Sequence, residues 1–441
     1  MTSLPSESNT RNHREARKVA RASFIGTTIE WYDFFLYGAA AALVFGPQFF
    51  PGGDPVLGQM GAFATFAVGF LTRPIGGMIA GHFGDRIGRK RMLVLSLLVM
   101  GSATVLVGVL PNYEQIGVTA PIILVLLRLL QGLAVGAEWG GAALMAVEHA
   151  PRRRRTLYGS SPQLGVPAGA ILSNVMMLGL SAATGDGFTE WGWRIGFIAS
   201  VVLVVYGLII RRTLTESPLF QQAAQHGPTR APLLQVLRRY PIGVLVAVFA
   251  TAASPAFGYT VLTFSLSHGT NEVGYGRDAL LTVIIVVSVI QLGATLMMAE
   301  FSDRFGRRRT MIVGSIFQIG AALAFFPLFD TGVIFLAGLA CTLGILTNAA
   351  QYAPLPAVMS DLFPTHLRYS GSSLGYQFGS IVGGSFAPII ATAIFAASGN
   401  SLLIGVYLAT LTVIALGAIV LAHRPVMSRR ATEGELESVQ T

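Results

Sequence analysis

The chain has 441 residues, of which 53% are apolar and only 12% are charged, and its mean hydropathy is +0.62. These values lie far outside the range of soluble globular domains and indicate an integral membrane protein. A net charge of +9 could suit a nucleic-acid partner, but the basic residues are concentrated in the loops and tails that flank the apolar stretches.

Apolar stretches of about 20 residues recur along the whole chain, and a helix of that length crosses the ~30 Å of hydrocarbon in a bilayer. Residues 92–110, 279–299 and 401–422 carry no charge at all. We therefore predict an all-α membrane protein with twelve transmembrane helices. The predicted spans are 22–47, 59–83, 92–110, 120–147, 157–182, 193–210, 241–267, 279–299, 310–329, 332–360, 370–397 and 401–422.

Basic residues are concentrated on one side of this predicted bundle. If both termini lie in the cytoplasm, all 30 Lys and Arg residues fall in cytoplasmic segments except Arg73, Arg128, Arg194 and Arg277. The asymmetry follows the positive-inside rule, and attraction to anionic lipid headgroups accounts for the basic loops. We predict a multi-pass protein of the cell membrane with cytoplasmic termini, a retained first span, lipid surroundings and no nucleic-acid partner.

Two short motifs occur twice, about half a chain apart. GDRIGRKR at 84–91 returns as SDRFGRRR at 302–309, and ExxPxxxR at 148–155 returns as DxxPxxxR at 361–368. Two repeats at nearly one offset indicate a duplicated bundle, which is an architecture of secondary transporters.

A polar stretch that contains Gly and Pro separates the two copies and is predicted to link two six-helix bundles. The predicted divisions are a cytoplasmic tail at 1–21, a first bundle at 22–212, a linker at 213–240, a second bundle at 241–423 and a cytoplasmic tail at 424–441.

Several segments spread over nearly the whole chain carry a family resemblance. GHFGDRIGRKR at 81–91 resembles the signature loop of the major facilitator superfamily, although Ala299 replaces the Gly that would begin the second copy. The remaining segments are EWYDF (30–34), RPIGG (73–77), LRLLQGLAVGAEWGG (127–141), WGWRI (191–195), ESPLF (216–220) and FPTHLRYSG (363–371). Together they resemble the bacterial metabolite:proton symporters, and most of all the shikimate-carrying members. The resemblance implies alternating access with protons as the coupling ion and no cofactor.

Five ionisable residues lie well inside predicted spans, where each costs roughly 2.5 kcal/mol or more. They are Glu30, Asp33, Arg73, Arg128 and Glu138. Arg73 precedes a proline near the cytoplasmic side, so we expect it to reach the membrane surface or to brace the loop at 84–91. For the others, the hypothesis is that Asp33 pairs with Arg128, that Glu30 or Glu138 completes a relay, and that one acid binds the coupling proton.

The second half lacks comparable buried charges and carries amides and phenols in their place. Such groups make directional hydrogen bonds to hydroxyls and carboxylates. With Tyr37, which shares a helix face with Glu30 and Asp33, and with Arg128, they could bind a small hydroxylated carboxylic acid. The predicted substrate-binding residues are Tyr37, Arg128, Gln291, Asn348, Gln351, Tyr376 and Gln377.

The repeated basic loops are predicted to latch the cytoplasmic side of the carrier, because breaking and remaking ion pairs shifts a conformational equilibrium. An acid at the C-terminal end of a helix opposes the helix dipole, so we also expect an Arg beside Glu148 and Asp361. The predicted gating residues are Asp85, Arg86, Arg89, Arg91, Glu148, Arg155, Asp303, Arg304, Arg307, Asp361 and Arg368.

Other chemistries lack their motifs. The sequence has no GxxxxGK[ST] loop, no metal-ligand spacing and no catalytic arrangement of its seven scattered histidines, and Cys341 is its single cysteine. We predict a monomeric symporter, not an enzyme, that imports a small organic acid, with a shikimate-like hydroxylated carboxylate as the first choice. Open alternatives are a proline or betaine symporter, a 2-oxoacid or dicarboxylate symporter, an exporter and a receptor that does not transport.

Overall fold

The computed structural model describes residues 7–52, 54–79, 89–136, 154–213, 232–363 and 367–422. The described residues of its first half are almost all helical. These elements are α1 (Glu7–Ala40), η1 (Ala41–Phe45), α2 (Gly46–Phe49), α3 (Pro55–Leu71), α5 (Arg89–Val109), α6 (Tyr113–Ile116), α7 (Thr119–Val135), α9 (Arg155–Gly159), α10 (Ser161–Thr184), η3 (Phe188–Gly192) and α11 (Trp193–Thr213).

The second half is also helical, and its long helices contain π-helical turns (η). These elements are α13 (Pro232–Arg239), α14 (Pro241–Tyr259), η4 (Thr260–Phe264), α15 (Ser265–His268), η5 (Gly269–Val273), α16 (Arg277–Phe305), α17 (Arg307–Phe329), α18 (Ile334–Tyr352), α19 (Leu355–Asp361), α20 (Arg368–Gly379), η6 (Ser380–Ser385), α21 (Ala387–Ser398) and α22 (Leu402–Leu421).

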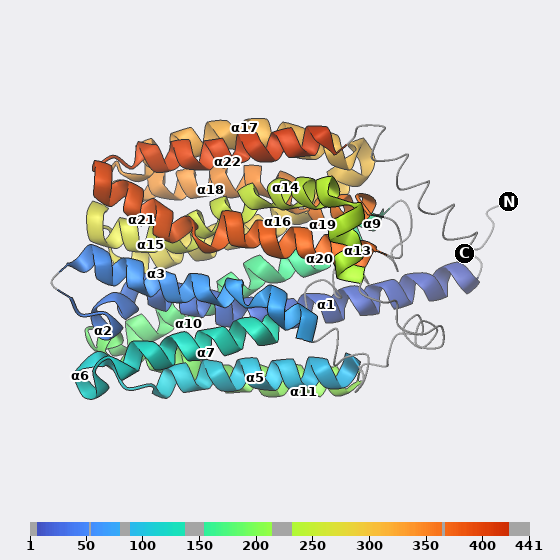
Figure 1. Cartoon of the computed structure of the whole chain (residues 1–441). Helices are drawn as coiled ribbons and strands as arrows, with labels where there is room; N and C mark the ends of the chain where they lie inside the picture. The colour runs from blue at the N-terminus through green and yellow to red at the C-terminus, as the bar shows by residue number, and fades with distance from the viewer. Residues whose placement is uncertain are drawn as a thin grey trace.

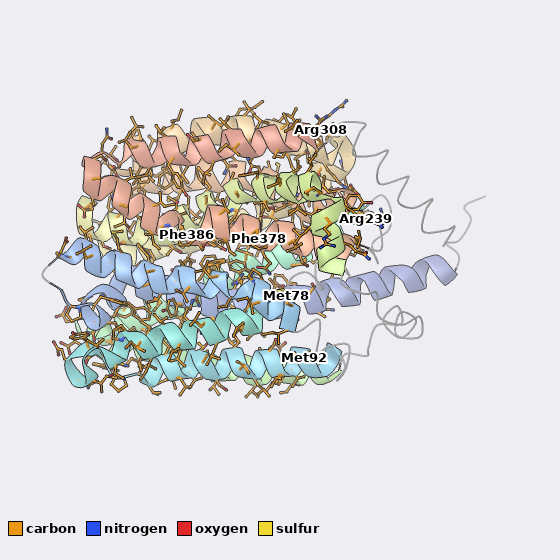
Figure 2. All side chains as sticks on the ribbon, in the orientation of Figure 1. Met78, Met92, Arg239, Arg308, Phe378 and Phe386 are labelled. Atoms are coloured by element: carbon orange, nitrogen blue, oxygen red, sulfur yellow. The ribbon has the colours of Figure 1, made fainter. Side chains whose placement is uncertain are left out.

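Twelve transmembrane helices can be followed through the described residues. Nine helical segments are long and apolar enough to cross a membrane, α5 and α7 contribute the shorter apolar stretches Val94–Val109 and Thr119–Val135, and α1 with its continuation is the remaining one. Large apolar side chains are exposed along their outer faces, for example Val202 and Phe317, and Figure 2 places Phe378 midway along the bundle. Such a surface suits lipid, which confirms the predicted all-α membrane fold.

The long helices run side by side along one axis, with the chain from α1 to α11 on one side and the chain from α14 to α22 on the other (Figure 1). α10 packs against both α1 and α16, and α3 packs against α21 and η6, so these helices join the two halves. One end of the molecule, here the α13 end, carries α9, α13 and α19, whereas the opposite α6 end carries α2 and α6.

Glycines set the close crossing of α3 and α7, and this crossing positions the buried charges. A Cβ atom at Gly132 would stand 2.1 Å from the carbonyl oxygen of Gly69, and one at Gly136 would stand 1.9 Å from that of Arg73. No side chain fits at either distance, so the backbones of the two helices touch.

Candidate functional site

Four of the five ionisable residues predicted inside the membrane lie together within the first half. Glu30 and Asp33 lie on α1, Arg73 lies two residues beyond the end of α3, and Arg128 lies on α7, each with 3% of its surface exposed. They face one narrow cavity, which is lined by Glu30, Asp33, Phe34, Gly69, Arg73, Met100, Arg128, Gln131, Gly132 and Val135. Since buried charges are rare and costly inside a membrane, this cavity is the candidate functional site.

Asp33 and Arg128 are connected by a chain of neutral hydrogen-bonding groups. Arg128 Nη1 donates to Gln131 Oε1 at 3.1 Å, Gln131 Nε2 donates to Thr104 Oγ1 at 2.8 Å, and the Thr104 hydroxyl reaches Asp33 Oδ2 at 3.0 Å. The predicted partners are therefore linked, but not in the predicted way: no direct ion pair joins Asp33 to Arg128 in the described structure. The reason is that Thr104, on α5, and Gln131, on α7, occupy the space between them.

Aromatic rings and a glycine hold the Arg128 side chain in place. Its guanidinium carbon lies 4.2 Å from the ring centroid of Tyr37, and the Tyr37 hydroxyl donates to Thr65 Oγ1 at 2.6 Å. A Cβ atom at Gly69 would stand 2.6 Å from Arg128 Nε, so the arginine lies across a position that only glycine can occupy. Tyr37 thus supports Arg128 from inside the first bundle, whereas its predicted contact with substrate stays a prediction.

Arg73 contradicts the expectation that it reaches the membrane surface. It is buried, with its guanidinium carbon 5.6 Å from the ring centroid of Trp31, 5.2 Å from that of Phe34 and 4.6 Å from that of Phe70. Its Nη2 lies 3.9 Å from Glu30 Oε1, which is an ion pair by distance but too long for a hydrogen bond. Ring faces and a carboxylate together keep the cation in the interior.

Tyr259 of α14 closes the space between the two halves beside this pair. Its ring centroid lies 5.4 Å from that of Phe34, 5.5 Å from that of Phe70 and 5.8 Å from that of Phe66. Offset and edge-on pairs of this kind stabilise a packed cluster. The second half therefore meets the charged site through an aromatic cluster.

The amides predicted to bind substrate are all buried in the second half, and few of their polar atoms are paired. Gln351 Nε2 donates to Ser315 Oγ at 2.9 Å. The side-chain carbonyl oxygens of Gln291, Asn348, Gln351 and Gln377 have no hydrogen-bond partner among the described residues. Buried acceptors without partners are costly, and a ligand with hydroxyl groups would satisfy them. Their role in binding stays a prediction.

Tyr376, the remaining predicted substrate residue, is buried on α20 with its hydroxyl hydrogen-bonded to Tyr352. Tyr259 and Tyr376 both lie within electrostatic range of Arg73 and Glu30.

The second basic loop joins the two halves at the α13 end. Both carboxylate oxygens of Asp303 accept backbone hydrogen bonds at the start of α9, from Thr156 N at 3.1 Å and from Leu157 N at 3.0 Å. Arg307 donates to Thr156 Oγ1 at 3.1 Å and to Asp361 Oδ2 at 2.7 Å. The ion pair confirms the expected arginine beside Asp361.

The other predicted gating residues are less informative. Arg304 pairs with Glu300 on the surface of α16, and Arg155 is half-buried at the start of α9. Asp85, Arg86, Glu138 and Glu148 lie outside the described residues, as do the side chains of Arg89, Arg91 and Arg368.

Sequence reasoning missed another buried titratable residue, His268 of α15. His268 Nε2 lies 2.9 Å from Asp330 Oδ1, and Ser401 donates to the other oxygen of that carboxylate. The imidazole stacks on Phe264 with 5.5 Å between ring centroids. A histidine at the end of an apolar stretch looked unremarkable in sequence, and its partners come from two other helix ends that sequence spacing could not bring together.

Comparison with known proteins places this geometry in a family. The model of the Major Facilitator Superfamily matches residues 23–388. The chain is 41% identical over 399 residues to the shikimate transporter of Escherichia coli (strain K12), which covers 89% of this chain and 91% of that protein. It is 33% identical over 416 residues to the proline/betaine transporter of the same strain, with coverage of 91% and 82%.

Solved structures agree on the fold. A crystal structure of a D-xylose-proton symporter superimposes with a TM-score of 0.71 and 19% identity, covering 92% of this chain and 97% of that one. A partially occluded, inward-open xylose transporter from E. coli gives a TM-score of 0.71 at 18% identity, with coverage of 91% and 96%. The resemblance seen in the sequence is thereby confirmed, and the chain belongs to the major facilitator superfamily as a multi-pass membrane transporter that is not an enzyme.

Proposed function

We propose that this transporter imports a small organic acid together with protons by alternating access. The observation that carries the proposal is the buried cavity of the first half, where two acids and two arginines face each other away from water. A carboxylate in such a place can gain a proton or a cation as its neighbours move, and that exchange can couple a proton to a substrate.

The substrate we propose is a shikimate-like hydroxylated carboxylate. Support comes from the relative named as a shikimate transporter and from the unpaired amide oxygens of the second half, which suit hydroxyl donors. A proline or betaine symporter is the second candidate, favoured by the relative of that name and by the acids on α1, which could receive a substrate cation. A 2-oxoacid or a dicarboxylate would also fit a buried arginine.

We propose that the α13 end faces the cytoplasm of the cell and that both termini lie there. Arg239 and Arg308 lie at this end (Figure 2), as the positive-inside rule requires of a cytoplasmic face. The predicted bundle limits at 22–212 and 241–423, the linker at 213–240 and the monomeric state belong to this proposal.

Alternating access would then work through the contacts between the halves. Asp303 and Arg307 tie the second half to α9 at the α13 end, whereas Arg277 donates to Ser181 at 2.9 Å at the α6 end. Asp303 and Arg277 lie at the two ends of α16, Arg307 begins α17, and their partners belong to α9 and α10. Rocking the halves about α10 and α16 would therefore break one tie and keep the other.

Uptake into proteoliposomes tests the proposal. Labelled shikimate, a 2-oxoacid, a dicarboxylate, proline and betaine are offered under an inward proton gradient, with and without a protonophore. We expect one carboxylate to accumulate, and the protonophore to abolish that accumulation. Equal uptake with and without the gradient would contradict proton coupling. High-affinity inhibition by many unrelated compounds would favour an exporter, and binding without accumulation would favour a receptor.

A further inference from the structure

We infer that Arg73 is the residue that binds the substrate carboxylate, and that Glu30 occupies this place when substrate is absent. The inference rests on the proposed function and refines it, since it names the group that every candidate substrate shares. Shikimate, 2-oxoacids, proline and betaine all carry a carboxylate, whatever else distinguishes them.

The first argument is the location of Arg73 between the two halves. Its guanidinium lies against Trp31, Phe34 and Phe70, and Tyr259 of the second half packs on the same rings. Arg73 therefore sits where the two halves meet, which is where repeat-built carriers bind substrate.

The second argument is the partner that each arginine already has. Both arginines keep donor atoms without a hydrogen-bond partner among the described residues, Nε in Arg73 and Nε and Nη2 in Arg128. Arg128 Nη1, however, is held by Gln131 in the chain that leads to Asp33, and its guanidinium lies over Tyr37. Arg73 instead lies 3.9 Å from the carboxylate of Glu30, a contact too long for a hydrogen bond and one that an incoming carboxylate can replace. A planar guanidinium with donors to spare is the group that binds a carboxylate through two parallel hydrogen bonds.

The third argument is charge balance. With Glu30 ionised beside it, Arg73 is neutralised in a site that excludes water. When a substrate carboxylate takes that place, a second negative charge would be buried unless Glu30 accepts a proton from water. The site then holds Arg73, the substrate anion and protonated Glu30, and its net charge is unchanged. Substrate and proton therefore enter together, and one proton accompanies each substrate at this site.

Equilibrium binding to the purified protein in lipid nanodiscs, without any gradient, tests this exchange. Labelled shikimate is displaced by unlabelled shikimate or by its methyl ester, which keeps the hydroxyls and lacks the charge. We expect the wild type to prefer the acid by on the order of 10- to 100-fold. Arg73→Gln should abolish that preference, Arg73→Lys should restore part of it, and the surface variant Arg239→Gln should leave it unchanged.

The pH dependence gives a second readout that a merely structural role would not alter. Wild-type affinity for the acid should fall as pH rises, because ionised Glu30 competes for Arg73. Glu30→Gln should bind the acid more tightly and with little dependence on pH. If Arg73→Gln keeps the preference for acid over ester while Arg128→Gln loses it, the inference is overturned and the proposed function stands.

Failure of the proposed function looks different. If the wild type binds neither shikimate nor labelled 2-oxoglutarate, proline or betaine, the protein is not a carrier of these acids, and the inference falls with that proposal. If an acid binds to the wild type with the same affinity as its ester, the carboxylate is not recognised, and the inference alone is overturned.

Discussion

Thr104 and Gln131 decide how the charges of the first bundle communicate. Each is buried, and each uses its side chain both to donate and to accept between Asp33 and Arg128. Neutral groups of this kind connect a carboxylate to a guanidinium without letting the two form a direct ion pair. A direct ion pair would be hard to break in a site that excludes water.

Replacing Thr104 with Val should therefore disconnect Asp33 from Arg128 with little change in shape. We expect gradient-driven uptake to fall about tenfold or more, since a lost hydrogen bond to a charged group is worth roughly 1.5–3 kcal/mol. Thr104→Ser should restore uptake. Ser96→Ala is the matched control. Ser96 lies on α5 like Thr104, and its hydroxyl donates to the backbone carbonyl of Ala134 on α7, the helix that carries Gln131. Equal uptake by Thr104→Val and wild type would show that the chain of hydrogen bonds is dispensable.

At the scale of residues, the sequence reveals a functional candidate through the free energy that a buried charge costs, but it does not reveal which side chains that charge contacts. Glu30, Asp33 and Arg128 could be predicted because an ionisable side chain inside an apolar stretch needs a reason. Thr104 was not predicted, since hydroxyl residues are common in transmembrane helices and only the tertiary fold brings this one within 3.0 Å of Asp33 on α1. Arg73 was misplaced for the same reason: three aromatic rings from two helices make an interior position tolerable.

At the scale of helices, the geometry of the site depends on how closely α3 and α7 approach. Gly132 and Gly136 place the backbone of α7 against that of α3, and this contact brings Arg128 and Arg73 to one cavity. Glycine costs helix stability in water, but within a membrane close packing of backbones repays that loss.

A methyl group at this crossing should separate the helices. Gly132→Ala should lower the Tm of the purified protein and abolish uptake, because its Cβ would overlap the Gly69 carbonyl oxygen and Thr72 Oγ1. Gly179→Ala on α10, where a Cβ meets no atom within 4 Å, should leave both measurements near wild type. Similar Tm values for the two variants would contradict the close crossing.

The ends of three helices in the second half are joined by one carboxylate. Asp330, which follows α17, binds His268 of α15 and Ser401 before α22. Asp330→Ala removes the hydrogen-bond partner of both His268 and Ser401. We therefore expect a loss of about 1–3 kcal/mol in the free energy of unfolding and a lower Tm. The exposed Asp186→Ala at the same end of the molecule serves as control. No difference between these variants would mean that the cluster does not stabilise the bundle.

At the scale of the whole molecule, the two halves are held at both ends by α16. Asp303 binds two backbone N–H groups of α9 in the other half, and such a capping carboxylate is worth about 1 kcal/mol. The surface pair of Glu300 and Arg304 lies next to it but stays within α16.

Asp303→Asn should therefore shift the carrier toward states that are open at the α13 end, roughly fivefold in the open-to-closed ratio for ~1 kcal/mol. Spin labels at the exposed positions Leu95 and Val313 report the distance between the halves, and Cys341 is too buried to react. Glu300→Gln should leave the distribution unchanged, because an exposed helical pair contributes little. A distribution in Asp303→Asn that matches the wild type would exclude this latch.

The fold as a whole could be predicted from periodicity and repeats. Twelve apolar stretches and a basic motif that recurs at 84–91 and 302–309 suffice for a duplicated bundle. The way the halves meet could not be predicted in that manner. The insertion of Tyr259 among the rings of α1 and α3 joins residues more than 180 positions apart, and no local pattern encodes such a contact.

The central claim is that a buried carboxylate ties proton movement to substrate movement, and Glu30→Gln in proteoliposomes tests it most directly. We predict that this variant exchanges labelled for unlabelled substrate across the membrane at a rate comparable to wild type. We also predict that it fails to accumulate substrate under a proton gradient, because its site can no longer trade a proton. Wild-type accumulation by Glu30→Gln would contradict the account.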